Sequence, residues 1–128
     1  MQKTIIQPPT LPDPTPRAYS HGVRVGNLLF VAGQTGADRE RRVEAGNFEA
    51  QTRRAFANIQ AVLEAAGGTL DNLVTMTVFI TDMRYGDEFV RLRREILGRD
   101  FPASALIGVS HLANPDALVE IQAIAVLD

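Results

Sequence analysis

The sequence predicts an α+β protein in which six strands form one mixed sheet and two helices cover one of its faces. Runs rich in β-branched residues alternate with turn signals in both halves of the chain, as expected of short strands. Two longer segments instead space their apolar residues by three and four, as one face of a helix does. The resulting order is three strands, a helix, a strand, a helix and two strands, which favours helices packed on a single side of the sheet.

The first third of the chain is expected to hold three strands. An edge strand is predicted at 3–7, followed by a proline-rich stretch at 7–17 that cannot be helical, because proline lacks the N–H and fixes φ. Strands at 19–25 and 28–32 should form a hairpin, since Gly26-Asn27 between them is a two-residue turn signal.

The two helices are marked by their ends. Asn47 is a candidate N-cap for a helix that runs to about Ala66, where Gly67-Gly68 supplies the stop. The second helix is predicted at 87–97 and ends at Gly98, with its apolar residues inward and its arginines outward.

Three further strands are predicted at 73–81, 104–112 and 118–127, and the polar, glycine-containing segment 33–46 is predicted to be a loop. Alternate residues of the last strand point to opposite faces, and both sets contain apolar side chains. Two helices can cover only one face of a six-stranded sheet. We therefore expect the second face to be covered by other copies of the chain in a symmetric oligomer.

Composition sets broad limits on function. The 128 residues are expected to form a single domain, 1–128, and 45% of them are hydrophobic and 22% charged. Without cysteine there is no disulfide, thiolate nucleophile or zinc–thiolate site. A net charge of −2 and a pI of about 5.7 argue against a nucleic-acid partner. No apolar run reaches membrane-spanning length, and we expect a cytoplasmic protein with neither metal nor cofactor.

Several motifs together resemble the RidA/YjgF family, also called the L-PSP endoribonuclease-like family. The opening Ala18–Val23, followed by Gly26–Gln34, is similar to the family's Tyr-x-x-Gly strand and its Ser/Ala-Gly-Gln strand end. Further similarity lies in the first helix at 51–67, the strand at 74–82, Phe101-Pro102-Ala103 and the last strand at 119–125. Their order and spacing extend the resemblance over about residues 3–128.

The resemblance implies a chorismate-mutase-like fold and a homotrimer with a small-molecule cleft between each pair of subunits. Family members hydrolyse reactive enamines and imines to 2-oxo acids and ammonia. An arginine directly after Phe-Pro-Ala binds the substrate carboxylate, for which a planar guanidinium is well suited. A glutamate in the last strand is thought to position the attacking water, and a tyrosine and the Gly-Gln turn complete the pocket.

Carried over by position, the glutamate falls on Glu120, the tyrosine on Tyr19 and the turn on Ala32, Gly33 and Gln34. The arginine position falls on Ser104, which has no charge and cannot replace the guanidinium fork. The chain therefore resembles an arginine-lacking branch of the family.

Each candidate residue also has a structural interpretation. Glu120 is either a general base with a raised pKa or a polar residue at a subunit interface. Ser104 either donates a hydrogen bond to a ligand or simply begins a strand, and Tyr19 is either a ligand contact or a packed aromatic. Arg17, two residues before Tyr19, offers another route to a carboxylate site. His21 and His111 lack metal-ligand spacing.

Three functions remain open. The leading hypothesis is an enamine/imine deaminase-like or related hydrolase that acts on a small carbonyl or imine metabolite. The second is a ligand-binding or regulatory trimer that has lost the chemistry, which the missing arginine favours. The third is an endoribonuclease, against which the acidic pI and the lack of an aromatic–basic stripe count.

Overall fold

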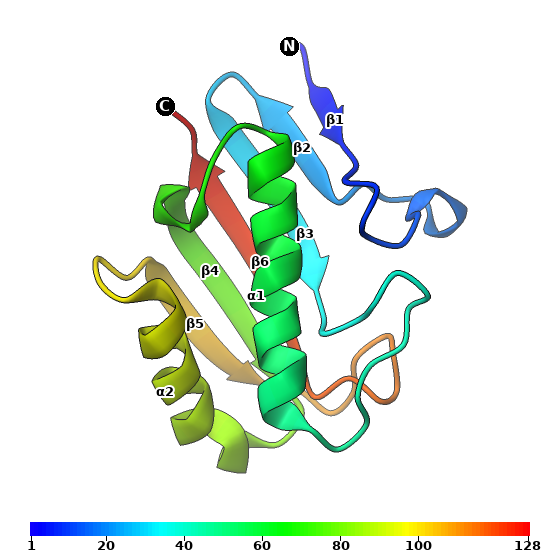
Figure 1. Ribbon diagram of the computed structural model, residues 1–128, viewed down its shortest axis with the longest axis vertical. Coiled ribbons are helices and arrows are strands. Elements are labelled where there is room, and N and C mark those ends of the chain that lie inside the picture. The colour runs from blue at the N-terminus through cyan, green and yellow to red at the C-terminus, as the bar shows by residue number, and fades with distance from the viewer.

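The computed structural model describes residues 1–128 and shows a six-stranded mixed sheet with two helices on one side (Figure 1). The order of strands across the sheet is β1-β2-β3-β6-β4-β5. All neighbours are antiparallel except β4 and β5. The strands are β1 (Thr4–Ile6), β2 (Gly22–Val25), β3 (Leu28–Gln34), β4 (Leu73–Ile80), β5 (Ala103–Gly108) and β6 (Val119–Val126). The predicted fold class is confirmed.

The strand bounds differ from the prediction by two residues or more in three places. β3 continues to Gln34, two residues into the segment predicted to be a loop. Residues 19–21 precede β2 instead of belonging to it, because the short helix η1 (Thr15–Arg17) brings the chain to the sheet only at Gly22. The prediction that 7–17 cannot be helical was wrong for these three residues, because proline is tolerated in the first turn of a helix, where its missing N–H has no intrahelical partner to lose. β5 ends at Gly108 rather than 112, because its parallel neighbour β4 ends at Ile80 and offers no partner further along. Residues 109–118 are thereby free to form a loop at one end of the sheet.

The helices α1 (Phe48–Ala65) and α2 (Gly86–Leu97) begin and end close to the predicted positions. Asn47 caps α1, with its side-chain oxygen accepting the N–H of Ala50 at 3.0 Å. Gly67 after α1 and Gly98 after α2 take positive φ angles, as a helix stop requires. α2 also provides the crossover that two parallel strands need, and it joins β4 to β5. The short helices η2 (Leu70–Asn72) and η3 (Met83–Tyr85) lead into β4 and α2.

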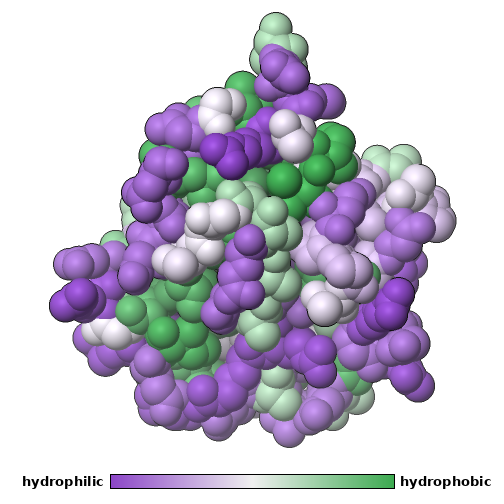
Figure 2. Space-filling view, turned by 45° about the horizontal axis from the view of Figure 1, so that its top comes forward, coloured by the Kyte–Doolittle hydropathy of each residue, from purple (hydrophilic) through white to green (hydrophobic).

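One hydrophobic core lies between the two helices and the sheet. The predicted inward residues Phe56, Ile59 and Leu63 of α1 are buried, as are Phe89 and Leu92 of α2. The Phe56 and Phe89 rings stack with their centroids 6.1 Å apart and tie the helices together. The side that carries the helices is mostly hydrophilic in Figure 2, with hydrophobic residues confined to separate patches.

The opposite face of the sheet carries apolar side chains and no covering element. Ile5 of β1, Leu28 and Phe30 of β3, and Ile107 of β5 are 39–46% exposed there. Their strand partners across the sheet belong to the same face: Phe30 lies opposite Ile124, for example. This open face is the surface for which the sequence predicts a covering partner.

Candidate functional site

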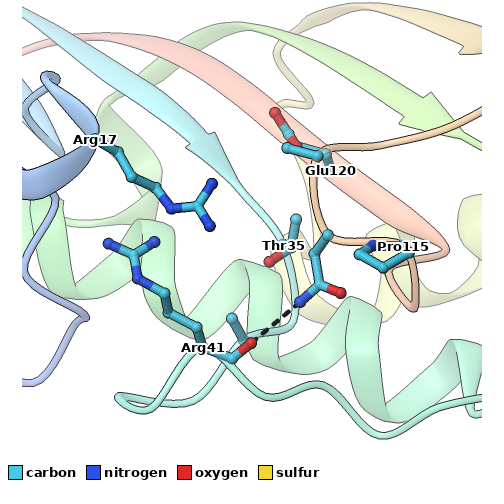
Figure 3. Close-up of a pocket in the computed structure, with 8 residues that line it drawn as sticks. Arg17, Thr35, Arg41, Pro115 and Glu120 are labelled. Atoms are coloured by element: carbon cyan, nitrogen blue, oxygen red, sulfur yellow. Dashed lines mark hydrogen bonds between the residues drawn. The ribbon is translucent and has the colours of Figure 1, made fainter.

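A cavity of about 320 Å³ opens at the end of the sheet where β3 finishes and β6 begins (Figure 3). Its walls come from the turn after η1, the loop 35–47 and the loop 109–118, together with the first residues of β6. The side chains that matter chemically are Arg17, Thr35, Arg41, Asn114, Pro115 and Glu120.

Glu120 is the carboxylate of this cavity. It pairs with Phe79 across the sheet and projects from the open face, because its neighbours Val119 and Ile121 are buried on the helix side. Burial raises the pKa of the Glu120 carboxyl above its usual value. Glu120 forms no ion pair. Its carboxylate is therefore free to accept a proton from a bound molecule.

Gly33 makes room for that carboxylate. A Cβ atom at Gly33 would lie 2.2 Å from Oε2 of Glu120, which is closer than any side chain can approach. The ladder between β3 and β6 shifts register between Val31 and Gln34, so Ala32 and Gly33 bulge out of regular pairing beside Glu120. The bulge and the missing side chain together set the position of the acid.

Two arginines from separate loops line the same cavity. Arg17 ends η1, and Arg41 lies in the loop between β3 and α1. Figure 3 shows both guanidinium groups turned toward the same part of the cavity, on the side away from Pro115. Neither arginine forms an ion pair.

Three side-chain amides hold the two loops that form the walls. Gln51 of α1 is 1% exposed and donates to the carbonyls of Glu44 and Asp116 at 2.9 and 3.1 Å, while its oxygen accepts the N–H of Leu118 at 2.8 Å. Gln51 thus links the loop 35–47 to the loop 109–118.

The other two amides hold the backbone of the loop 35–47. Asn58, also on α1, donates to the carbonyls of Thr35 and Ala37, both at 3.0 Å. Asn114 donates to the carbonyl of Arg41 at 3.1 Å, the contact drawn in Figure 3. None of these three amides was predicted from the sequence. Gln51 and Asn58 could have been found, because they are polar residues at inward positions of an amphipathic helix and buried polar groups need hydrogen-bond partners.

The comparisons with known proteins cover nearly the whole chain. The model of the family described as "Endoribonuclease L-PSP" matches residues 11–127. The chain belongs to this family. The resemblance to the RidA/YjgF family, inferred from the motifs, is confirmed.

Two curated relatives and one solved structure show how close the similarity is. A RutC family protein of Pyrococcus abyssi is 36% identical over 126 residues, which are 98% of each chain. A 2-iminobutanoate/2-iminopropanoate deaminase of Dermatophagoides farinae is 32% identical over 127 residues, again 98% of each. The crystal structure of a putative endoribonuclease of Thermotoga maritima is 33% identical, covers 100% of this chain and 99% of its own, and superposes with a TM-score of 0.91.

Within the RidA/YjgF fold, the predicted site residues have different surroundings. Glu120 lines the cavity, and Gly33 lies directly against its carboxylate. Ala32 is tied through its N–H to the carbonyl of His21 at 2.8 Å. Tyr19 is 39% exposed and meets the His21 ring edge-on at 5.6 Å, outside the cavity lining.

Gln34 belongs to a buried network that ties the proline-rich segment to the sheet. Its Nε2 donates to Nδ1 of His21 at 3.0 Å, and Nε2 of His21 then donates to the carbonyl of Pro12 at 2.7 Å. Gln34 is 4% exposed, so its side chain is committed to this network.

Ser104, which the motif alignment predicts to stand at the family's arginine position, lies far from Glu120 in this chain. It pairs with buried Met76 on the helix side of the sheet, and its hydroxyl accepts a hydrogen bond from Nη1 of Arg93 on α2 at 2.6 Å. Glu120 projects from the opposite face, two strands away. Within one chain the structure does not bring the two residues together.

No group of three or more His, Cys, Asp or Glu side chains is arranged to hold a metal ion. No helix has both the length and the apolar character needed to cross a membrane.

Proposed function

We propose that the chain is the subunit of a homotrimer that hydrolyses the C=N bond of small imines or enamines in clefts between subunits. The observation that carries this proposal is the carboxylate of Glu120, which is half-buried, unpaired and placed at a cavity of about 320 Å³. A cavity of that size accommodates a small metabolite. The deaminase name of the Dermatophagoides farinae relative supports the same reaction class.

Glu120 would act as the general base. Its carboxylate accepts a proton from a water molecule while the water oxygen bonds to the carbon of the protonated imine, which gives a neutral carbinolamine. The protonated Glu120 then returns that proton to nitrogen. As the C–N bond breaks, the carbinolamine O–H proton passes to the Glu120 carboxylate, a carbonyl compound forms, and the departing ammonia takes that proton away as ammonium. Burial raises the pKa of Glu120 toward the operating pH, which favours both the uptake and the return of the proton.

The open face of the sheet supports assembly into a trimer. Its exposed apolar side chains extend from β1 to β5, and a contiguous apolar surface of this kind is typically covered in a folded protein. A symmetric arrangement buries the same face in every subunit. In such a trimer, Ser104 of one subunit would reach the Glu120 cavity of another, since the two residues lie apart within one chain.

Under this proposal the chain belongs to an arginine-lacking branch. Ser104 directly follows Phe101-Pro102-Ala103, and its hydroxyl already accepts a hydrogen bond from Arg93. A serine hydroxyl provides no charge for a carboxylate, so the substrate's acidic group must be held by other residues.

The test is imine hydrolysis, with 2-aminoacrylate or 2-iminobutyrate generated in situ and ammonia release measured. We expect wild type to accelerate the reaction and Glu120→Gln to lose at least about 100-fold of that acceleration, in the range usual for loss of a general base. Glu64→Gln, a carboxylate-to-amide change on the exposed side of α1, is the matched control and should behave as wild type. Equal activity of Glu120→Gln and wild type would remove Glu120 from the mechanism.

The second candidate function is a ligand-binding or regulatory trimer. The serine at position 104 favours it, because the charged group that RidA-type hydrolysis is expected to need at that position is missing. This alternative predicts saturable binding of 2-oxo acids with no ammonia release from wild type. Activity that appears only in Ser104→Arg would show that the rest of the cleft is intact and that the natural ligand is not an imino acid.

An endoribonuclease role has little support in the structure despite the family's name. His21 is buried in its network with Gln34 and Pro12, which leaves it unavailable for RNA cleavage. The net charge of −2 provides little attraction for a phosphate backbone.

A further inference from the structure

The charges of the cavity are not balanced. Arg17 and Arg41 bring two positive charges to it, and Glu120 brings one negative charge. No ion pair joins the carboxylate to either arginine. Burial raises the pKa of Glu120, and neither arginine offsets that rise.

Both guanidinium groups keep free hydrogen-bond donors. Arg41 uses one N–H, from Nη2, to the backbone carbonyl of Asp13 at 2.6 Å. Arg17 makes no side-chain hydrogen bond within the chain. A guanidinium has five N–H donors arranged in a fork that matches a carboxylate, so most of the donors at this wall have no partner.

The backbone of each arginine is tightly constrained. Arg41 itself has a φ of +67°, a backbone angle that residues other than glycine rarely adopt. The turn around it is closed by Asp38, whose Oδ1 accepts the N–H groups of Glu40 and Arg42 at 2.9 Å. Asn114 fixes its carbonyl from the opposite loop.

Arg17 is held in a similar way. Its N–H donates to the carbonyl of Pro14 at 2.9 Å, and Ala18 directly after it has a φ of +60°. Two of the three positive-φ residues other than glycine are therefore Arg41 and the neighbour of Arg17. Uncommon backbone conformations cluster at ligand sites, where they aim a side chain.

The geometry points to an anion clamp: Arg17 and Arg41 together bind the carboxylate of the substrate and so replace the arginine absent at position 104. This inference rests on the proposed hydrolysis at Glu120. The substrate class it names is a small 2-imino or 2-enamino acid, with the carboxylate between the two guanidinium groups and the C=N carbon toward Glu120. A neutral imine of the same shape would gain nothing from the clamp.

Arg93 is the alternative candidate for holding the substrate carboxylate. Arg93 is the arginine closest to the family position, because it donates to the hydroxyl of Ser104. It also lies over the Phe89 ring, 5.1 Å from the centroid, which engages its planar face. A variant at Arg93 therefore separates the two explanations.

The experiment compares Arg17→Gln, Arg41→Gln and their double variant with wild type in two assays. The first is imine hydrolysis with separate KM and kcat. The second is binding of the product-like probe 2-oxobutanoate, with neutral 2-oxobutanamide as the uncharged analogue, followed by NMR or calorimetry. Arg39→Gln, an exposed arginine two residues from Arg41, is the matched control, and Arg93→Gln tests the alternative candidate.

We expect each clamp variant to raise KM and the Kd of 2-oxobutanoate by about 10-fold to 100-fold, as loss of a charge-assisted hydrogen bond does. The kcat should change little, and the amide should bind weakly to every variant. Arg39→Gln and Arg93→Gln should match wild type. Unchanged KM and Kd in the double variant would overturn the clamp, as would an increase found only in Arg93→Gln.

The two proposals fail in different ways. If wild type binds 2-oxobutanoate through Arg17 and Arg41 but releases no ammonia, the clamp stands and the hydrolase proposal falls. If hydrolysis depends on Glu120 but not on either arginine, the hydrolase proposal stands and the clamp falls.

Discussion

Replacing Gln51 should loosen both walls of the cavity at once. Its side chain is 1% exposed and makes hydrogen bonds of 2.9, 3.1 and 2.8 Å to three backbone groups on two loops. Each such bond contributes about 1 kcal/mol net, so Gln51→Ala should lower the free energy of unfolding by about 3 kcal/mol. The groups left behind are the carbonyls of Glu44 and Asp116 and the N–H of Leu118, all partly buried.

Urea unfolding followed by circular dichroism measures the effect. With an m-value of about 1.5–2 kcal/mol per M, a loss of 3 kcal/mol moves the midpoint down by about 1.5–2 M. All variants must be compared at one protein concentration, because dissociation of an oligomer makes the midpoint depend on concentration. Gln60→Ala is the matched control on the same helix, since its one side-chain hydrogen bond, to Glu64, is exposed.

Gln51→Glu separates hydrogen bonding from packing. The glutamate keeps the shape and accepts the N–H of Leu118, but it cannot donate to the two carbonyls when ionised. It should therefore destabilise at neutral pH and recover part of the loss in acid. Amide exchange should also quicken at 36–47 and 113–118 in Gln51→Ala. A midpoint within about 0.3 M of wild type for Gln51→Ala, less than 1 kcal/mol on this m-value, would refute the bridging role.

Three further outcomes follow from the site. Glu120→Gln should be more stable than wild type at neutral pH and equal to it in acid. Burial raises the folded-state pKa of Glu120, so wild type loses stability as pH rises through that pKa. The amide of the variant does not ionise, so the variant does not lose this stability. Urea midpoints from pH 3 to 8 check this, and a constant difference across that range would contradict it. Gly33→Ala should reduce the rate of hydrolysis about 100-fold with little loss of stability, because the new Cβ displaces the flexible end of the Glu120 side chain. Displacing a reacting group by about 1 Å lowers the rate by roughly this factor. Unaltered kinetics would contradict the prediction. Gly36→Ala should instead lower the free energy of unfolding by about 1–3 kcal/mol, since its Cβ would lie 2.5 Å from the backbone of Gln51. Thermal unfolding of both variants should show a lower midpoint for Gly36→Ala than for Gly33→Ala.

The sequence predicted the elements well because each carries a local signal. Asn47 and Gly67 mark the ends of α1 by their own chemistry, and the Gly26-Asn27 turn forces the β2–β3 hairpin. The open face was predicted from the alternation in β6 and from the fact that two helices can cover only one face of the sheet. The end of β5 was misjudged because it depends on where β4 stops, which is a property of the pairing and not of residues 104–112.

The candidate site was less accessible to sequence reasoning. Glu120 and Gly33 were found through position in a family motif, and the structure brings them into contact range. Arg17 was raised as a second route to a carboxylate site, and the structure places it at the cavity. Arg41 was not predicted as a site residue, because the direction of its side chain depends on a left-handed backbone and on contacts with Asp13 and Asn114. Contacts between loops distant in the chain leave no local signature.

The two edges of the sheet have different protection against unwanted strand pairing. β1 is only three residues long and runs into the prolines at 8 and 9, which cannot extend a ladder. β5 has six residues, no proline within it, and an exposed Ile107 beside its free backbone edge. In the proposed trimer this edge lies next to a neighbouring subunit. A chain that has lost its neighbours would expose both the β5 edge and the apolar open face while still folded, so we expect aggregation to begin with dissociation rather than with unfolding.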